Sequence, residues 1–478
     1  MPLPTIPSGN VASALGEAYE VANSLRFNSG DSAKLQITSL GTPSDAKKWT
    51  WSGWVKMAKM SGDRGIMRML ASVNDYTALN FNGNGQLEFD NKVSGSFGGR
   101  RMTSAYYRDP AAWMHIVAVF DSDNGTGDDR MILYVNGSRI TAFGTDTDPS
   151  SGEASGLASG NTTTLGLSGT YYNGCYLAEV VFIDGQALAP TSFGEFDSDS
   201  PTIWKPKDVS GLTFGDEGYW LDFENSGDLG NDVSGNNNDF DTVTNLAAAD
   251  QAVDTPTNNF CVINPLDNEY AEATLTEGNC NTAMSASKYN YITSTFGLSK
   301  GKWYFEAKLT AAGGTAATVG IAASPTSSAS DYLGGDADGA AILYQISGSG
   351  NKSILHGTEA TYGSTSIAVN SVLGIYIDLD NNKAYGSVDG TLQSATGLNI
   401  TAPASTSTGF YFPAFGDYDG SDAYTWAVNF GGCPPYSISS SNNDGDYGSF
   451  EYSTTITGDG SSKTFKAICS KNLGEFGG

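Results

Sequence analysis

The feature that most constrains this chain is a pattern of strand, acidic turn, strand, Asx-Gly turn and strand, which occurs twice. The first copy runs over residues 113–140 and the second over residues 372–392. In each copy apolar runs are bounded by polar turns, which is typical of strands buried on at least one face. Asn136-Gly137 and Asp389-Gly390 suit tight hairpins, because both central turn positions require a positive φ. The repeat therefore predicts two β domains of related shape.

Charge excludes several classes of partner. The chain has 478 residues, with 25 Lys and Arg against 52 Asp and Glu, which gives a formal net charge of −27. Nucleic acids and anionic membranes repel such a surface, so we expect no nucleic-acid partner. No run approaches the roughly 18 apolar residues that a membrane span needs, so we expect no membrane insertion. The first ten residues lack a basic region followed by an apolar core, and no secretory signal peptide is expected.

The cysteines form no metal-ligand spacing and no dense disulfide framework. There are five, an odd number, at widely separated positions: Cys175, Cys261, Cys280, Cys433 and Cys469. This pattern predicts free thiols in a protein made in a reducing cytoplasm. A bridge between Cys261 and Cys280 is the alternative.

The first half of the chain resembles the laminin-G-like, concanavalin-type family of jelly rolls. The motifs that carry the resemblance are Ser24–Phe27, Thr50–Lys56, Trp113–Asp121, Leu133–Gly137 and Leu177–Asp184. We predict a β-sandwich over residues 21–248, preceded by an extended N-terminal arm, residues 1–20, that is either a frayed terminus or a docking peptide. Trp49 and Trp51 share one face of a strand, and we interpret them as core residues, with a ligand platform as the alternative.

One segment departs from the order of that family. Gly218–Glu224 and Asp232–Asp239 resemble the stretch that normally opens the domain, yet here they follow its last recognisable strand. Either the sandwich is circularly permuted, and residues 219–223 complete one of its sheets, or a second copy begins here and is truncated. We favour permutation, since an orphan apolar strand would expose an edge. We then expect residues 218–240 to belong to the first sandwich and to pair beside one of its early strands.

The second half resembles a SPRY domain, itself a concanavalin-type sandwich. Residues 249–284 are polar and predict a linker, and residues 285–478 predict the second sandwich with a C-terminal tail. The motifs are Gly301–Leu309, Ala317–Ala322, Ser371–Leu379, Tyr411–Phe415 and Trp426–Gly431. The predicted fold class is therefore all-β: two concanavalin-type antiparallel β-sandwiches (jelly rolls) in tandem, with an N-terminal extended arm.

Catalytic machinery is scarce. His115 and His356 are the only histidines, and no Ser/His/Asp set can be assembled from them. Jelly-roll glucanases carry paired carboxylates on a Glu-x-Asp-x-x-Glu strand. The nearest match is Glu195-Phe-Asp197-Ser-Asp199-Ser200, which lacks the closing glutamate. We predict that the protein is not an enzyme and keep glycoside hydrolysis as an alternative.

Candidate binding residues lie on loops. Acidic turns offer oxygen ligands for calcium, from Asp121, Asp123 and Asp128 in one loop and from Asp232 and Asn236 in another. If the permutation is right, the two loops approach one another and form one site. Several tyrosines are candidates for stacking on sugar rings: Tyr106, Tyr107, Tyr171, Tyr172, Tyr411, Tyr418 and Tyr424. No cofactor is required by the sequence, and calcium is the one that it allows.

The arm, the two sandwiches and the linker containing Asp254–Asn259 resemble structural proteins of tailed bacteriophages. The resemblance implies a fibre-like virion appendage, made in the host cytoplasm, whose partners are other virion proteins and a host surface glycan or receptor. Oligomerisation is expected through the sandwiches or the arm, because no heptad or collagen-like stalk is present. A purely structural decoration or connector protein and a depolymerase are the alternatives.

Overall fold

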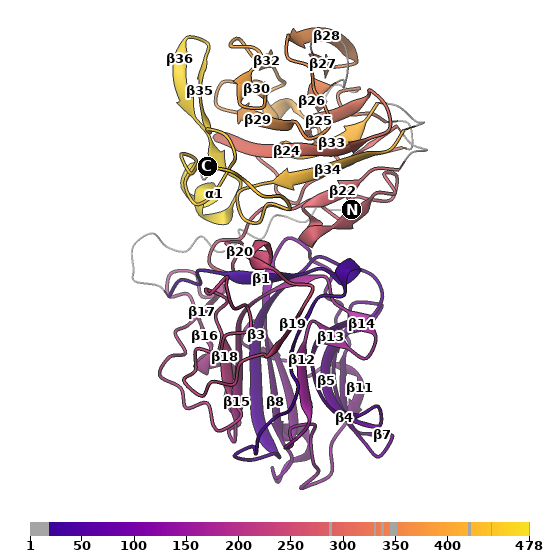
Figure 1. Ribbon diagram of the computed structural model, residues 1–478, viewed down its shortest axis with the longest axis vertical. Helices are drawn as coiled ribbons and strands as arrows, with labels where there is room; N and C mark the ends of the chain where they lie inside the picture. The colour runs from indigo at the N-terminus through magenta and orange to yellow at the C-terminus, as the bar shows by residue number, and fades with distance from the viewer. Residues whose placement is uncertain are drawn as a thin grey trace. The chain divides into compact units, whose positions relative to one another are not determined.

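The computed structural model describes residues 19–285, 289–328, 331–335, 339–344, 351–418, 422–440 and 442–477. The predicted N-terminal arm lies outside this set except for Tyr19 and Glu20. The described residues divide into two compact units, one ending at Thr257 and the other beginning at Asn258 (Figure 1). Each unit has two large antiparallel sheets around a hydrophobic core of its own, so the predicted pair of β-sandwiches in tandem is confirmed.

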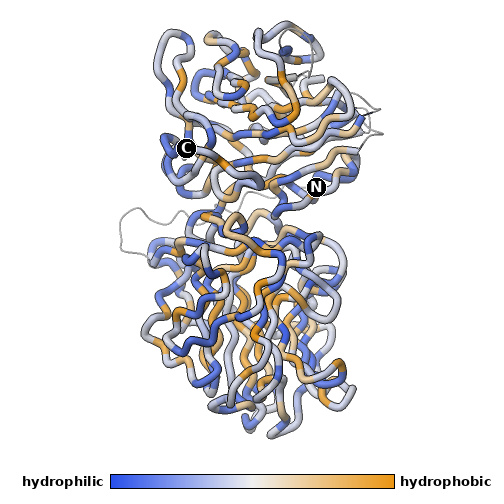
Figure 2. Tube along the Cα trace, viewed as in Figure 1, coloured by the Kyte–Doolittle hydropathy of each residue, from blue (hydrophilic) through white to orange (hydrophobic). Residues whose placement is uncertain are grey.

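Helix is rare in this part of the chain. Its one α-helix, α1 (Ser470–Phe476), is short, and no helix there is long and apolar enough to span a membrane. The apolar stretches instead follow the strands, and polar residues dominate the loops between them (Figure 2).

In the described residues the first unit has two eight-stranded sheets and two small two-stranded ones. One has the order β10-β9-β8-β3-β15-β1-β20, with β18 also paired to β15. Its strands are β10 (Ser138–Arg139), β9 (Met131–Val135), β8 (Trp113–Asp121), β3 (Lys48–Met57), β15 (Cys175–Asp184), β1 (Ser24–Phe27), β20 (Gln251–Ala252) and β18 (Tyr219–Leu221). The other is formed, in order, by β11 (Phe143–Thr147), β7 (Ser96–Thr103), β6 (Leu87–Val93), β5 (Asp75–Phe81), β4 (Arg64–Ser72), β12 (Thr162–Leu165), β2 (Lys34–Ile37) and β19 (Thr242–Thr244).

The core of the first unit lies between these sheets. Trp49 and Trp51 are fully buried in it, and the Trp49 ring stacks on Phe120 with centroids 5.6 Å apart. The interpretation of both indoles as core residues is confirmed. The Asn136-Gly137 turn between β9 and β10 has positive φ at both residues, 47° and 75°, as the hairpin requires.

The displaced segment completes the first sandwich. Strand β18 pairs antiparallel with β15, with Tyr219 opposite Phe182, and Tyr219, Leu221 and Phe223 enter the core. Residues 219–221 thus pair within a sheet of the first unit, as the permutation interpretation predicts. The predicted partner was wrong, because β18 pairs with β15, a late strand of the unit, and not with an early one. Further along, β19 pairs with β2 and β20 pairs with β1, so the unit extends past residue 248.

The second unit has a nine-stranded and a six-stranded sheet in the described residues. The larger contains β21 (Thr274–Thr276), β22 (Asn281–Ala283), β34 (Tyr424–Asn429), β24 (Lys302–Ala312), β29 (Val372–Asp378), β30 (Lys383–Val388) and β31 (Thr391–Leu392), with β32 (Leu398–Asn399) beside β30 and β37 (Lys466–Ala467) parallel to β24. The smaller has the order β23 (Tyr291–Thr293), β33 (Phe412–Asp417), β25 (Ala317–Ala322), β26 (Gly339–Tyr344), β27 (Asn351–Leu355) and β28 (Thr358–Gly363).

The predicted linker over residues 249–284 is not a linker in the structure. Its start carries β20 of the first unit, and its remainder belongs to the second unit, where Cys261 and Ile263 are buried in the core. The boundary therefore falls at residues 257–258. Polar composition misled the prediction, because buried Asn and Thr side chains here satisfy backbone groups and do not mark exposed chain.

The C-terminal segment covers the outer face of the larger sheet of the second unit. Aromatic rings of the sheet, including Tyr304, Tyr376 and Tyr385, form a second small core with Phe450 and Phe465 of that segment. The buried carboxylate of Glu306 holds the same segment by accepting five hydrogen bonds, from Tyr304 Oη, Tyr436 Oη, Asn429 Nδ2 and the backbone N–H groups of Glu451 and Tyr452. The unit is therefore three layers deep on this side.

Candidate functional site

His115 on β8 is the side chain that comes nearest to a catalytic arrangement. Its Nε2 lies 2.8 Å from Oγ of Ser52, and its Nδ1 lies 2.9 Å from the indole Nε1 of Trp204. Because an indole N–H can only donate, Nδ1 must accept, and the proton of the neutral ring therefore sits on Nε2. The imidazole donates to Ser52 and cannot take a proton from it. Ser52 and His115 therefore do not form a catalytic pair of nucleophile and general base.

The surroundings of His115 keep it uncharged. Its ring is fully enclosed, stacking on Trp54 at 4.8 Å and on Trp204 at 6.0 Å between centroids. Burial lowers the pKa of His115 to about 3, so the ring is neutral at physiological pH. His356 belongs to the other unit and contacts Thr401, with 3.2 Å between Nε2 and Oγ1. These contacts agree with a structural role for His115.

The carboxylates singled out for hydrolysis are already paired. Glu195 and Asp197 both lie near Nζ of Lys205, at 3.5 and 3.4 Å. Asp197 also accepts the backbone N–H groups of Asp199 and Ser200, and these bonds lower its pKa. An acid with a lowered pKa that is fixed in a turn is a poor proton donor. Glu195 and Asp197 therefore organise the β16 (Gly194–Phe196) to β17 (Trp204–Pro206) hairpin.

Sequence motifs did not single out a better placed pair of carboxylates, Glu88 and Asp90. Glu88 and Asp90 alternate on β6, on the face of the sheet that points away from the core. The Glu-x-Asp spacing within a strand is the signal that could have identified this pair. Arg100 on β7 lies across from both, with Nη2 3.0 Å from Glu88 Oε1 and Nε 3.1 Å from Asp90 Oδ1. Burial raises the pKa of Asp90 to about 7, and the Arg100 charge only partly offsets it.

One row of side chains across this outer face is mostly polar. A row of residues in register runs from strand to strand: Gln36, Thr164, Arg68, Ala78, Asp90, Arg100 and Thr147. In the Glu-x-Asp-x-x-Glu pattern that starts at Glu88, the closing glutamate would fall at position 93, which is a valine. The face therefore presents no third carboxylate on that strand, as the glucanase pattern would need.

The two predicted calcium loops lie apart. Asp121 and Asp123 face Lys48 and Lys47, at 3.5 and 3.6 Å, and Asp128 follows in the same loop. Asp232 and Asn236 lie beside β18, and β3 and β15 stand between β18 and β8. At about 4.8 Å per strand, the strands that carry the two loops are roughly 14 Å apart. A joint site stays a prediction.

Hydrogen bonds within the chain occupy the second loop. Asp232 accepts bonds from Trp220 N, Ser234 N and Oγ, and Asn238 N, and the Asn236 amide donates to the carbonyls of Gly215 and Gly218. No group of three or more His, Cys, Asp or Glu placed to hold a metal ion occurs among the described residues. Calcium binding by either loop alone stays a prediction.

Two of the seven tyrosines predicted to bind ligand are core residues. Tyr411 and Tyr424 are buried, and their hydroxyls respectively donate to the Thr401 carbonyl at 2.9 Å and accept from Ala316 N at 2.8 Å. Tyr106 and Tyr171 are about half exposed, whereas Tyr107 and Tyr172 are partly covered. Both side chains lie in the core of the second unit, so their rings cannot stack on a sugar.

Tyr418 belongs to an aromatic cluster that spacing in the sequence did not reveal. Its ring lies 4.4 Å from Tyr332 and 6.5 Å from Tyr289, and those two are 6.4 Å apart. The pairing of Tyr291 with Gly416, extended by two residues, puts Tyr289 opposite Tyr418 at the end of β23 and β33. Tyr289 is 39% exposed, so the cluster reaches the surface.

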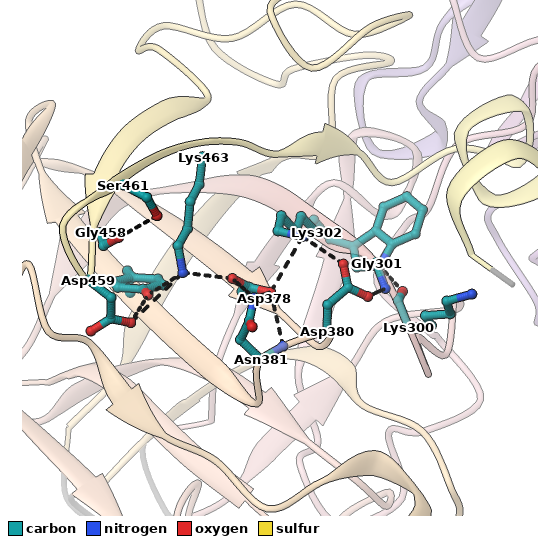
Figure 3. Close-up of polar contacts among 12 residues, drawn as sticks. Lys300, Gly301, Lys302, Asp378, Asp380, Asn381, Gly458, Asp459, Ser461 and Lys463 are labelled. Carbon is teal, nitrogen blue, oxygen red and sulfur yellow. Dashed lines mark hydrogen bonds and ion pairs between the residues drawn. The ribbon is translucent and has the colours of Figure 1, made fainter.

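A charged cluster of the second unit serves to anchor a hairpin (Figure 3). Lys463, on the hairpin of β35 (Thr455–Gly458) and β36 (Ser461–Thr464), places Nζ 2.9 Å from buried Asp378 on β29 and 3.0 Å from the Tyr385 hydroxyl. Lys302 pairs with Asp380 at 2.6 Å. Each carboxylate here has a cationic partner, so the cluster holds the C-terminal segment and offers no unpaired acid or base.

Comparisons with known proteins agree with this architecture. Residues 28–191 match the concanavalin A-like lectin/glucanases superfamily, and residues 302–416 match the SPRY domain. The chain carries these two domains in tandem. No curated protein matches it.

Solved structures that resemble the chain do so at low identity. They include domains LG4-5 of the mouse laminin alpha1 chain (12% identity, 84% of each chain covered), the heptameric SAP-like pentraxin of Limulus polyphemus (17%, 36% of this chain and 80% of that one) and the SPRY domain of human HERC1 (14%, 34% and 94%). The TM-score is 0.27 in each case. Likeness at this level carries no information about ligands.

Proposed function

We propose that this protein is a structural component of a tailed-bacteriophage virion, carried on a fibre-like appendage, and that it recognises glycans or other receptors on the host surface. The proposal extends the resemblance of the whole chain to such proteins. Its partners are then other virion proteins and a host surface molecule.

The observation that carries the recognition role is the cluster of Tyr289, Tyr332 and Tyr418. Three loop-borne rings meet at one end of the second sandwich, and the outermost is more than one third exposed. Tyrosine combines a large apolar ring with a hydroxyl, and it is enriched where rigid proteins contact ligands. Loops held by a rigid β scaffold are the usual position of such contacts.

The chemistry of the candidate catalytic groups favours binding over hydrolysis. His115 donates to Ser52 and remains neutral, and the carboxylates at positions 195 and 197 share a lysine. Neither set provides a free base and an acid facing each other across a site. Recognition through a shallow aromatic patch is weak for one site, so adhesion depends on several copies acting together.

The test is binding of purified protein to host cells and to a glycan array, as a single chain and in oligomeric form. Tyr289→Ala is expected to weaken binding by about tenfold, since truncating an interface tyrosine typically costs more than 1 kcal/mol. Tyr447→Ala is the matched control, because Tyr447 is a half-exposed tyrosine of the same unit outside the cluster.

Two further measurements separate the alternatives. Antibody labelling of particles by electron microscopy tests the position on an appendage, and a protein found on virions without any affinity for host cells is a decoration or connector. Release of oligosaccharides from host envelopes, lost in Glu195→Gln or Asp197→Asn, identifies a depolymerase and contradicts the proposal.

A further inference from the structure

A row of alternating cations and aromatic rings crosses the outer face of the β4–β7 sheet in the first unit. The Arg68 guanidinium lies 4.2 Å from the centroid of Tyr76, and Lys92 Nζ lies 5.6 Å from the same ring and 6.0 Å from Phe97. Arg100 follows, 4.4 Å from the Phe97 centroid. We call these five side chains the cation–aromatic ladder. It occupies adjacent strands whose pairing is continuous from β4 to β7.

The charges along the ladder are unevenly balanced. Arg100 is paired with Glu88 and Asp90. Within the described part of the chain, by contrast, Arg68 makes no side-chain hydrogen bond or ion pair, and its buried Nε has no acceptor. Lys92 has only the Val73 carbonyl at 3.5 Å. Although the protein has twice as many acids as bases, these two cations of one face have no carboxylate partner among the described residues.

Asp75, a carboxylate on which the Lys92 charge acts, is already occupied. Asp75 accepts hydrogen bonds from Ser94 N at 2.7 Å and Ser72 Oγ at 2.9 Å, and it forms no ion pair with Lys92. Arg68 and Lys92 lie over one ring and are therefore within about 10 Å of each other. An anionic group between them gains charge-assisted hydrogen bonds from both.

An exposed tyrosine borders the ladder at its Arg68 end. Gly169 joins β13 (Leu167–Ser168) to β14 (Tyr171–Tyr172), and a β-carbon there would lie 3.7 Å from Arg68 Nη1 and 4.0 Å from the Tyr171 ring. Tyr171 is 51% exposed, and Phe97 at the other end is 40% exposed. Rings thus flank the two unpaired cations. Beyond Arg68, on the side away from Lys92, the register row continues with the hydroxyl of Thr164 and the amide of Gln36.

We propose that this face binds an acidic polysaccharide, with sugar carboxylates at Arg68 and Lys92 and sugar rings against Tyr171 and Phe97. The proposal stands apart from the tyrosine cluster of the second unit and from a virion origin. Alternating cations and rings match a polymer that alternates carboxylates with pyranose faces. An acidic peptide would satisfy the cations without needing the exposed rings.

The overall negative charge does not prevent such binding at physiological salt. The Debye length is then about 8 Å, so acids elsewhere on the chain are largely screened from this face. Binding should weaken as salt rises, because it depends on solvent-accessible ion pairs. A guanidinium also presents a planar fork that fits a carboxylate in two parallel hydrogen bonds.

The experiment is titration of the full chain with polygalacturonate and with the same polymer after its carboxyls have been reduced to alcohols. We expect binding of the acidic form and none of the reduced form. Arg68→Gln combined with Lys92→Gln should weaken binding by roughly tenfold or more, since each change removes a charge-assisted contact. Tyr171→Ala should weaken it without altering charge, and Arg139→Gln is the matched control, because Arg139 is an exposed arginine of the same unit paired with Asp129.

Each outcome decides the proposal, provided that melting temperatures show the variants to be folded. Absence of binding by the unaltered chain, or equal binding by the Arg68 and Lys92 double variant, overturns it. Equal affinity for the reduced polymer overturns the role of the carboxylates. Equal affinity for polyglutamate, with no effect of Tyr171→Ala, assigns the face to any polyanion and overturns the sugar class.

Discussion

At the scale of single residues, this protein holds several ionisable groups in the state that burial dictates. His115 is kept neutral between two indoles and a serine, and Asp90 is buried beside Arg100 on the outer face of a sheet. A histidine and a carboxylic acid respond to burial in opposite directions, since burial disfavours the charged form of each. Their contributions to stability therefore change with pH in opposite senses.

His115 should make the first unit sensitive to acid. Its pKa is about 3 when folded, against an ordinary value near 6.5, so the unfolded chain gains a proton first as pH falls. The stability it supports is present above about pH 6.5 and is lost towards pH 3, a change of roughly 3–5 kcal/mol. Urea unfolding at several pH values should show a flatter profile for His115→Gln, in which the amide can replace both ring hydrogen bonds. If the free energy of unfolding of His115→Gln falls with decreasing pH as steeply as that of the unaltered chain, His115 is not the source of the acid sensitivity.

Asp90 should make the first unit less stable as pH rises. Burial raises its pKa to about 7, so its ionisation opposes folding as pH rises from about 4 through 7. Asp90→Asn is expected to be more stable than the unaltered chain at pH 8, by about 2 kcal/mol, with no difference near pH 4. If the variant is instead less stable at pH 8, the ion pair with Arg100 outweighs the cost of burying the carboxylate.

At the scale of elements, the first sandwich depends on strands that arrive late in the chain. After β18 and β20 have joined their sheet, Asp254 reaches the buried ammonium of Lys56 on β3, with Nζ 2.6 Å from Oδ2. Trp113 Nε1 also donates to Asp254, at 3.0 Å. One carboxylate beyond the predicted domain end thus ties the returning segment to β3 and β8.

Removing the Asp254 carboxylate should strongly destabilise the first unit. Asp254→Ala is expected to cost about 3–5 kcal/mol, because the Lys56 ammonium loses its carboxylate while remaining buried. Lys56→Met combined with Asp254→Asn should recover much of the loss, since the uncompensated charge is gone. Thermal unfolding of the two variants measures this. A double variant no more stable than Asp254→Ala would show that Trp113 and the backbone contacts matter more than the charge.

The elements also show where sequence patterns suffice. Turns with a local chemical requirement, such as Asn136-Gly137 and Asp389-Gly390, were predictable, because only a few residues accept positive φ at both positions. The partner strand of β18 was not predictable, because a strand of three residues can pair with many sheet edges. Tyr411 and Tyr424 looked like surface rings for the same reason: side-chain direction follows from register, which long-range pairing decides.

The candidate sites were less predictable than the fold. The tyrosine cluster and the cation–aromatic ladder each combine residues from three or more segments, and no local spacing links them. The net charge of the sequence also does not reveal Arg68 and Lys92 as a site, because it does not show which cations lack a carboxylate partner. Only the strand pairing brings these features together.

At the scale of the whole molecule, the two units have separate hydrophobic cores without a shared residue. We therefore expect residues 19–257 and 258–478 to fold when produced separately, each with β-type circular dichroism and cooperative unfolding. Asp254→Ala should lower the melting temperature of the first fragment and leave the second, which lacks this residue, unaffected. An unfolded fragment would show that its unit depends on the rest of the chain.

The closing contacts of the second unit join its two ends. Ser470 N donates to the Asn259 carbonyl, Cys261 N donates to the Ile468 carbonyl, and β37 lies parallel to β24. During synthesis on the ribosome, the sheet around β24 cannot be completed until residues 466–470 have emerged. The first unit has all of its strands much earlier, so it can finish folding while its neighbour is still being translated. Until residues 466–470 emerge, their partners in β24 and in residues 259–261 stay unpaired in the nascent second unit, and unpaired strand edges favour aggregation.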